Sequence, residues 1–222
     1  MNMWNQEFLS DGVKNDVQIY CGNTLCVLNM GMKRRLLKVN ARNKGRPGNA
    51  VKVNTYFADK MKILLIQFDK SDKMGTIGVA ESEKITSAFE YAAQKKMPVI
   101  AGVASGGIRV NEGTLALMQM AKMAAAVKQH SAKGLLYISI VTNPTLGGAS
   151  ASFVSLADII IAEKDTVYGF SGRRIIEDTT HEQLPEDFQT AEYAIRHGMV
   201  DIVADKSEIK QIISKLLRLH KR

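Results

Sequence analysis

Two pairs of adjacent glycines stand between apolar stretches and helix-like segments. The first pair, Gly106 and Gly107, lies in "ASGGIRVNEG", and the second pair, Gly147 and Gly148, lies in "NPTLGGASASF". Glycine lets a ligand approach backbone amides directly, and amides at a helix start have no partner within the helix. Such a turn can bind a phosphate or stabilise a thioester oxygen that becomes negative. The same glycines could instead only form tight turns that let a helix pack closely on a sheet.

Other kinds of chemistry find little support around these turns. Neither turn matches the P-loop or the dinucleotide-binding fingerprint. Ser105, Ser150 and Ser152 lie beside the glycines, but the G-x-S-x-G motif of serine hydrolases is absent. A serine mechanism would also need a histidine as its base, and nothing marks one among the candidates. The four histidines are His130, His181, His197 and His220.

The elements that carry these turns follow an α/β pattern. Apolar runs predicted as strands alternate with amphipathic stretches predicted as helices. The predicted strands are residues 50–57, 61–68, 97–103, 134–141, 157–163 and 199–204, and the predicted helices are residues 78–96, 111–129, 186–198 and a last helix from Asp205. Each glycine pair follows a predicted strand and opens a helix. If the two strands adjoin, the two turns face one cavity.

The domain organisation follows from where this alternation begins. Residues 1–48 have no regular pattern and end in the loop signal "NKGRPGN", so they are interpreted as an N-terminal extension. Residues 49–222 contain no internal repeat and no low-complexity linker, which predicts one α/β domain. The chain has 222 residues, of which 45% are hydrophobic, enough for a sizeable core.

The net charge of +8 arises largely from one segment. Eight basic residues and no acid lie between Lys33 and Lys52, and a second basic cluster ends the chain. This is either a solvated surface or a site for a phosphate-bearing partner. A small phosphorylated ligand is favoured over nucleic acid, because no aromatic residues are interleaved to stack on bases.

Composition also bears on location and metal binding. The N-terminal residues lack the pattern of a secretory signal, and no apolar run is long enough to span a membrane, so a cytoplasmic protein is expected. Cys21 and Cys26 have C-x4-C spacing with no second pair and no nearby histidine, so no zinc site is expected.

At the glycine turns the chain resembles the β subunit of bacterial acetyl-CoA carboxylase carboxyltransferase, a family with a crotonase-like fold of ββα units. The resemblance is carried by "ASGGIRVNEGTLALMQMAK", "YISIVTNPTLGGASASF", "DIIIAE", "GFSGRRIIEDT" and "LPEDFQTAEYAIRHGMVDIV". These stretches run almost without gaps from about residue 97 to 204. A weaker likeness continues upstream through "RRLLKVNARNKGRPGNAV" and "MKILLIQFDKSDKMG".

The resemblance implies a function and a set of partners. In that family the β subunit binds acyl-CoA, and an α subunit binds carboxybiotin carried on a separate biotin carboxyl carrier protein. The expected reaction is carboxyl transfer from carboxybiotin to acetyl-CoA, giving malonyl-CoA for fatty acid or polyketide-like synthesis within an ATP-dependent complex. An assembly of two α and two β subunits is expected, with no nucleic acid and no membrane partner.

The resemblance also implies roles for particular residues. The backbone amides of Gly147 and Gly148 would stabilise the enolate oxygen of the thioester. A nitrogen atom of biotin itself would take the proton from the α-carbon. Gly106, Gly107 and Arg109 would line the acyl-CoA site, although Arg109 could instead hold the loop through a salt bridge. Within the basic run, Arg34 and Arg35 are candidates to bind the CoA phosphates. No protein nucleophile and no metal is implied.

The chain departs from the family at several motifs. A four-cysteine zinc ribbon usually begins these proteins, whereas here it is absent or degenerate. The glycine-rich "GGSMG" of the family is replaced around "KSDKMGT", and the proline of "GPR" is Arg173 here. These changes leave open a malonate decarboxylase-type subunit or a catalytically inactive partner protein of the same fold. A crotonase-like hydrolase or isomerase would need an acid or base that the sequence does not mark.

Overall fold

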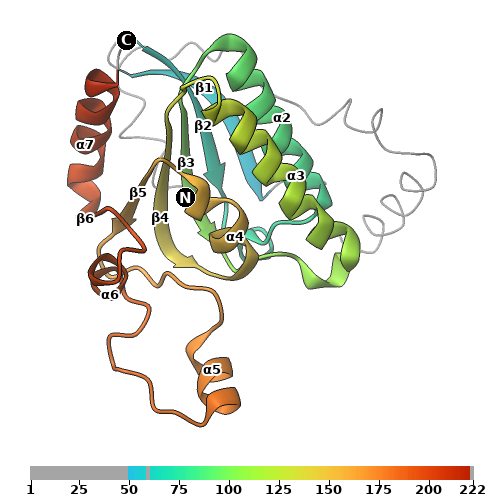
Figure 1. The fold of residues 1–222 in the computed structure, drawn as a ribbon, viewed down its shortest axis with the longest axis vertical. Coiled ribbons are helices and arrows are strands. Elements are labelled where there is room, and N and C mark those ends of the chain that lie inside the picture. The colour runs from blue at the N-terminus through green and yellow to red at the C-terminus, as the bar shows by residue number, and fades with distance from the viewer. Residues whose placement is uncertain (1–49, 59–60, 221–222) are drawn as a thin grey trace.

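A computed structural model describes residues 50–58 and 61–220, and over these residues the chain forms a six-stranded sheet in the order β1 to β6. The first two strands make an antiparallel hairpin, and the others extend the sheet in parallel (Figure 1). The strands are β1 (Val51–Ala58), β2 (Met61–Phe68), β3 (Val99–Ser105), β4 (Tyr137–Thr145), β5 (Ile159–Glu163) and β6 (Ile202–Ala204).

Helices cover both faces of this sheet. The helices are α2 (Val79–Lys95), α3 (Thr114–Ser131), α4 (Gly147–Ser152), α5 (Arg173–Thr180), α6 (Ala191–Arg196) and α7 (Lys206–Leu219), with short 3₁₀ turns η2 (Lys73–Gly75), η3 (Val110–Glu112) and η4 (Val154–Leu156). Helices α2 and α3 pack side by side on one face, and α7 lies on the other (Figure 1). The sheet is therefore the middle layer of three.

The strands are apolar on both sides because both faces are covered. In β2, Leu64 and Ile66 point into the core beneath α2 and α3, while Ile63 and Leu65 point into the core beneath α7. This alternation is the two-residue period of an extended strand. Every second side chain of the central strands therefore anchors a different helical layer.

Aromatic rings fill the larger core, and an aliphatic stripe closes the smaller one. Phe89 of α2 meets Tyr137 edge-on with ring centroids 5.0 Å apart, and Phe153 lies 6.0 Å from Phe89. Edge-to-face pairs of this kind add to the stability gained from apolar burial. On α7, the buried residues Ile209, Ile213 and Leu217 lie on one face of the helix, the spacing typical of an amphipathic helix.

The α/β fold class predicted from the sequence is confirmed, with differences in two helices. The helix predicted over 111–129 begins at Thr114, after the turn η3. The helix predicted over 186–198 is reduced to α6, because the backbone before it pairs instead with Tyr168 through the Gln189 carbonyl. The boundary predicted at residue 48 lies outside the described residues and stays a prediction.

One segment projects from the body of the molecule. The chain between β5 and α6 leaves the sheet and carries α5 away from it, forming an arm (residues 171–187) that is visible at the lower end of Figure 1. Helix α5 buries none of its residues. In the described part of the chain, no helix has the length and apolar character that crossing a lipid bilayer requires.

Candidate functional site

The two glycine turns meet at one edge of the sheet. Strands β3 and β4 are parallel neighbours, so their carboxyl ends lie side by side. A Cβ atom built on Gly107 would lie 3.3 Å from the Cα of Gly147, and one built on Gly147 would lie 3.2 Å from the Cα of Gly107. The two strands therefore adjoin, as the prediction of a shared site required. The two turns contact one another backbone to backbone.

The second turn has one occupied amide and one uncovered amide. Gly147 adopts φ +64°, a left-handed conformation that glycine takes without strain. Its N–H donates to the carbonyl of Phe170 at 2.8 Å. For the Gly148 N–H, by contrast, the described residues provide no hydrogen-bond acceptor. The sequence predicts that both amides are available to a ligand, whereas the structure shows the Gly147 amide bonded to Phe170.

The reason for this difference is a short pairing at the end of β4. Thr145 N–H donates to Val167 O at 2.9 Å, and Gly169 N–H donates to Thr145 O at 3.2 Å. The segment that follows β5 therefore runs beside the end of β4, and its next carbonyl, that of Phe170, comes opposite Gly147. The Gly147 amide is used to fix the turn, whereas the Gly148 amide has no acceptor among the described residues.

The serines beside the second turn serve as backbone supports. Ser150 Oγ lies 2.7 Å from both the Gly147 and the Gly169 carbonyls and can donate to either, and Ser152 Oγ donates to Gly148 O at 2.5 Å. Among the described residues no serine pairs with a histidine. The alternative of a serine nucleophile therefore gains no support from the geometry.

Side chains at the glycine positions would crowd the place where the two turns meet. A Cβ on Gly107 would lie 3.4 Å from the Gly148 nitrogen, and φ at Gly107 is +109°. A Cβ on Gly148 would lie 2.3 Å from Cγ1 of Ile108, well inside contact distance. Neither position therefore has room for a side chain unless neighbouring atoms shift.

The first turn is held by backbone hydrogen bonds to the segment that precedes α2. Gly106 N–H donates to Met74 O at 3.0 Å, and Ile77 N–H donates to Gly107 O at 2.9 Å. Arg109 N–H returns to Ile77 O at 2.8 Å. The Gly107 N–H contacts Ser105 Oγ at 3.1 Å. The "KSDKMG" segment, where the chain departs from the family pattern, therefore packs directly on the first glycine turn.

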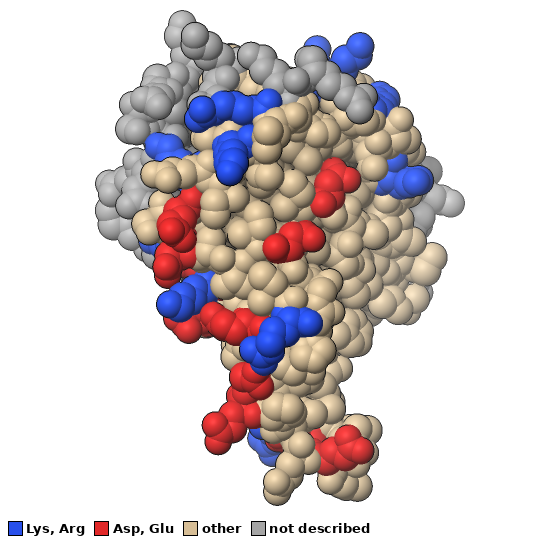
Figure 2. Space-filling view, turned by 60° about the vertical axis from the view of Figure 1, so that its left-hand side comes forward, with Lys and Arg blue, Asp and Glu red and all other residues tan. Residues whose placement is uncertain are grey.

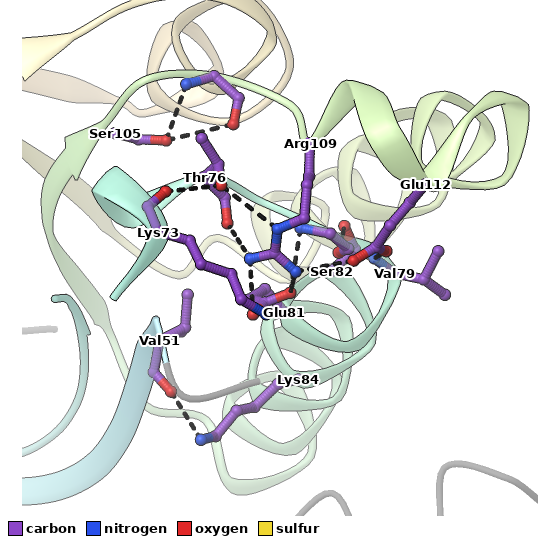
Figure 3. A network of polar contacts seen from close by, with 12 residues as sticks. Val51, Lys73, Thr76, Val79, Glu81, Ser82, Lys84, Ser105, Arg109 and Glu112 are labelled. Carbon is purple, nitrogen blue, oxygen red and sulfur yellow. Dashed lines mark hydrogen bonds and ion pairs between the residues drawn. The ribbon is translucent and has the colours of Figure 1, made fainter. Parts of the chain in front are cut away.

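Arg109 lies beneath the first turn in a buried cluster of charges (Figure 3). Its Nη1 donates to Glu81 Oε2 at 3.0 Å and to Glu112 Oε1 at 2.8 Å, and its Nη2 donates to Glu81 Oε1 at 3.0 Å and to Thr76 O at 2.7 Å. Its Nε donates to Thr76 Oγ1 at 3.3 Å. A guanidinium has five N–H donors, and all five are used here.

This geometry favours one of the two roles that the sequence left open for Arg109. With every donor bonded to protein and only 7% of the residue exposed, Arg109 has no group free to bind a ligand. The contacts favour the role of Arg109 in holding the loop, and its role in binding acyl-CoA stays a prediction. Burial by itself would lower the pKa of Arg109, but its hydrogen bonds to Glu81 and Glu112 and the negative charges of these carboxylates outweigh burial and raise the pKa.

Both carboxylates of the cluster also cap helix α2. Glu81 Oε2 accepts from the Gly78 N–H at 3.1 Å, and Glu112 Oε2 accepts from the Val79 N–H at 2.7 Å. Two carboxylates and one guanidinium leave one net negative charge, which the positive end of the helix favours. Sequence reasoning missed Glu81 and Glu112. The signals were the spacing of Glu81 three residues after Gly78, as in a capping box, and of Glu112 three residues after Arg109.

The arm forms an open surface pocket of about 630 Å³, and none of its lining residues belongs to the glycine turns. It is lined by Arg173, Glu177, His181, Glu182, Gln183, Leu184 and Glu186. Arg173 is engaged there by protein groups, donating to Glu177 Oε1 at 2.9 Å and to Pro185 O at 2.7 Å. Acidic side chains gather on the narrow lower end of the molecule in Figure 2. This surface does not favour a phosphate.

Several expected features cannot be placed in the structure. Arg34, Arg35, Cys21 and Cys26 lie outside the described residues. Within residues 50–58 and 61–220, no group of three or more His, Cys, Asp or Glu side chains is arranged to hold a metal ion. The roles of Arg34 and Arg35 as candidates for CoA phosphates therefore stay predictions.

Comparison with known proteins identifies relatives of this arrangement. Residues 31–219 match the family described as Carboxyl transferase domain, and the match begins inside the predicted N-terminal extension. The chain is similar to acetyl-coenzyme A carboxylase carboxyl transferase subunit beta of Latilactobacillus sakei subsp. sakei (strain 23K), with 52% identity over 149 residues. That alignment covers 67% of this chain and 53% of the relative, so the chain matches about half of the relative's length.

Solved structures show the same fold. Transcarboxylase 12S with methylmalonyl-coenzyme A and methylmalonic acid bound has a TM-score of 0.73 at 27% identity, covering 79% of this chain and 35% of that chain. A Pseudomonas malonate decarboxylase hetero-tetramer in complex with malonate has a TM-score of 0.73 at 17% identity, covering 91% of this chain and 76% of that chain. The second likeness concerns the fold alone. The crotonase-like fold expected from the sequence is confirmed.

Proposed function

Because this chain belongs to the carboxyl transferase domain family, we propose that it is the acyl-CoA-binding, β-type subunit of a biotin-dependent carboxyltransferase. Its proposed reaction is transfer of a carboxyl group from carboxybiotin to acetyl-CoA, giving malonyl-CoA. The 52% identity to an acetyl-CoA carboxylase carboxyl transferase subunit beta supports acetyl-CoA as the acceptor. The bound methylmalonyl-coenzyme A in transcarboxylase 12S supports an acyl-CoA site in this fold.

The observation that carries this proposal is the uncovered N–H of Gly148 between two glycine turns. Removing a proton from the α-carbon of a thioester places negative charge on its carbonyl oxygen. A fixed backbone N–H that points at this oxygen stabilises the charge as it develops, because the donor needs no reorganisation. Gly148 fits an acyl thioester, since the absence of side chains at Gly107 and Gly148 lets a carbonyl reach the amide.

Each glycine has its own part in this site. Gly148 donates the hydrogen bond, and Gly147 turns the backbone with φ +64° while its own amide holds Phe170. Gly107 lies against the second turn, where a side chain would crowd the Gly148 nitrogen, and Gly106 precedes it in a turn that would line the acyl-CoA site. Carboxybiotin on its carrier protein would supply the carboxyl group and a nitrogen base for the α-proton. The chain's own part is to bind, orient and stabilise the acyl-CoA.

The proposal extends to partners and setting. We assign carboxybiotin binding to a carboxyltransferase α subunit and its delivery to a biotin carboxyl carrier protein, in an assembly of two α and two β subunits. The complex would act in the cytoplasm, coupled to ATP-dependent carboxylation of biotin, and feed fatty acid or polyketide-like synthesis. Arg34 and Arg35 would bind the CoA phosphates, and no zinc ion would be needed.

Two measurements on the full chain test the proposal. Calorimetry with acetyl-CoA, malonyl-CoA and free CoA should show preference for the acyl thioesters, and the Gly148→Val variant should lose that preference. Addition of an α subunit and biotinyl carrier should give malonyl-CoA with the natural chain and none with the variant. A folded Gly148→Val protein with normal turnover would refute the proposed site. Equal binding of free CoA and acetyl-CoA would refute thioester recognition.

A further inference from the structure

The cluster of Arg109, Glu81 and Glu112 (the charged cluster) joins segments that lie apart in the chain. Arg109 follows the first glycine turn, Glu81 lies in the first turn of α2, and Glu112 ends η3. Arg109 also reaches the carbonyl and hydroxyl of Thr76, in the segment before α2. Figure 3 shows these side chains converging from different elements beneath the turn.

The charged cluster is connected to the uncovered amide through a short series of contacts. Ile108 stands between Gly107 and Arg109 in the chain and packs against Gly148. A Cβ built on Gly148 would lie only 2.3 Å from Cγ1 of Ile108. Gly107 contacts Gly147 backbone to backbone. A shift of Arg109 would therefore move Ile108 and Gly107 relative to Gly148. Interiors are packed too closely to absorb such a shift without moving neighbours.

We propose that Arg109, Glu81 and Glu112 are positioning residues that fix the first glycine turn against the second and so set the opening in front of the Gly148 amide. The expected effect on turnover rests on the proposed function, whereas the positioning of the turns does not. The polar groups of all three side chains bond to protein groups. Their contribution is the constraint that the first turn receives from the start of α2.

Each carboxylate oxygen of Glu112 has its own donor, which makes this residue the most informative one of the cluster to substitute. Oε1 accepts from Arg109, and Oε2 accepts from the Val79 N–H. In a Glu112→Gln variant one of these donors must face an NH₂ group that cannot accept. A buried donor without an acceptor is costly, so the cluster must rearrange. The change in volume is small.

Helix α2 also provides a matched control. Glu83 is buried and its two oxygens bond Lys122 Nζ of α3 at 2.5 and 2.6 Å. A Glu83→Gln variant removes the same charge as Glu112→Gln, here from α2, and also breaks a part-buried ion pair. Its contacts join α2 to α3 and do not include the glycine turns. It reports what loss of a buried carboxylate does by itself.

The first experiment measures steady-state carboxyl transfer to acetyl-CoA in the reconstituted complex. For Glu112→Gln and Arg109→Lys we expect kcat to fall by about tenfold or more, with KM for acetyl-CoA nearly unchanged. Lysine keeps the charge but has only three donors, so it cannot replace the guanidinium fork. For Glu83→Gln we expect kcat equal to that of the natural chain. A raised KM with unchanged kcat in Arg109→Lys would overturn the proposal in favour of substrate binding.

The second experiment needs no activity. Amide hydrogen exchange should become faster in Glu112→Gln at both glycine turns, residues 105–113 and 147–153, and should stay unchanged there in Glu83→Gln. Unchanged exchange at the turns in Glu112→Gln would overturn the proposal whatever the turnover. Faster exchange with full turnover would also overturn it. If exchange is faster but the natural chain transfers no carboxyl group, the proposed function fails while the positioning role stands.

Discussion

The backbones of Gly107 and Gly147 are in direct contact, although they belong to turns after different strands. A Cβ on either glycine would come within 3.3 Å of the other residue's Cα. This contact depends on the parallel pairing of β3 with β4, which brings the ends of both strands to one edge of the sheet. The candidate site is thus a property of the strand register, with glycine required at the point where the turns meet.

The Gly107→Ala variant should lose carboxyl transfer while keeping its fold. The added methyl group would lie 3.4 Å from the Gly148 nitrogen and would force a side chain onto φ +109°. We expect kcat to fall by about 100-fold, as when an oxyanion donor is removed, and stability to fall by about 1–3 kcal/mol. Steady-state kinetics and thermal unfolding measure the two effects.

Gly198→Ala is the control for this variant. Gly198 has φ +67° and no atom within 4 Å of an added Cβ, at the end of α6. It should cost about 1 kcal/mol of stability from backbone strain alone and leave turnover unchanged. Equal turnover of the Gly107 and Gly198 variants would show that the methyl group at Gly107 does not obstruct the Gly148 amide.

The contact between Gly148 and Ile108 can be tested by compensation. Gly148→Ala should destabilise the protein by about 1–3 kcal/mol, because the new Cβ would lie 2.3 Å from Ile108 Cγ1. Ile108→Ala in the same chain removes that atom and should recover part of the loss. We expect the double variant to be about 1 kcal/mol more stable than the sum of the single changes predicts. Denaturant unfolding measures all four proteins, and strict additivity would contradict the contact.

The segment before α2 contains left-handed residues where glycine would be less strained. Met74 has φ +56° and is exposed, and Gly75 has φ +63°. Met74→Gly should raise the free energy of unfolding by about 0.5–1 kcal/mol, since the relief of left-handed strain exceeds the entropy cost of glycine. Gly75→Ala should lower it strongly, because the new Cβ would lie 2.1 Å from Ala104 O.

Lys96→Gly provides the reference for this pair. Lys96 has φ +53° at the C-cap of α2, is exposed, and lies at the opposite end of that helix from the charged cluster. It should show a gain similar to that of Met74→Gly, and neither change should alter the Arg109 contacts. A loss of stability in Met74→Gly alone would mean that the Met74 side chain holds the first glycine turn.

The layers of the fold could be predicted from the sequence because they follow local patterns. The apolar run of β2 and the last helix from Asp205 were both predicted from such patterns. The glycine turns were also visible, since adjacent glycines after a strand are a local signal. The shortened α6 was not, because Gln189 is fixed at φ +67° by its pairing with Tyr168, a tertiary contact that overrides the helical pattern.

The parts of the site that the sequence did not reveal depend on contacts between distant residues. Arg109 and Glu81 are 28 residues apart, and nothing local to either indicates that they meet. The occupancy of the Gly147 amide likewise depends on the course of the segment leading to Phe170. Sequence patterns therefore located the turns, and only the assembled sheet shows which amide is uncovered.

A buried histidine of α3 should make the protein sensitive to acid. His130 is fully buried, and its Nε2 lies 2.9 Å from Met97 O, so Nε2 carries the proton. Its Nδ1 has no hydrogen-bond partner in the described residues, and Phe89 meets the ring edge-on. Burial lowers the pKa of His130, opposed by the hydrogen bond to Met97 and by Asp158 and supported by Lys133. The folded protein therefore holds this ring neutral.

The sign of the pH dependence follows from this lowered pKa. Below pH 6.5, the ordinary value for histidine, the unfolded chain takes up a proton that the folded protein excludes until its own lower pKa is reached. The free energy of unfolding should thus decrease as the pH is lowered through this window, with a slope of up to about 1.4 kcal/mol per pH unit from this group. A His130→Gln variant should be less stable at pH 8 but lose less between pH 6.5 and 5. Carboxylates titrate in both proteins and cancel in the difference, so parallel stability curves would mean that His130 is protonated in the folded state.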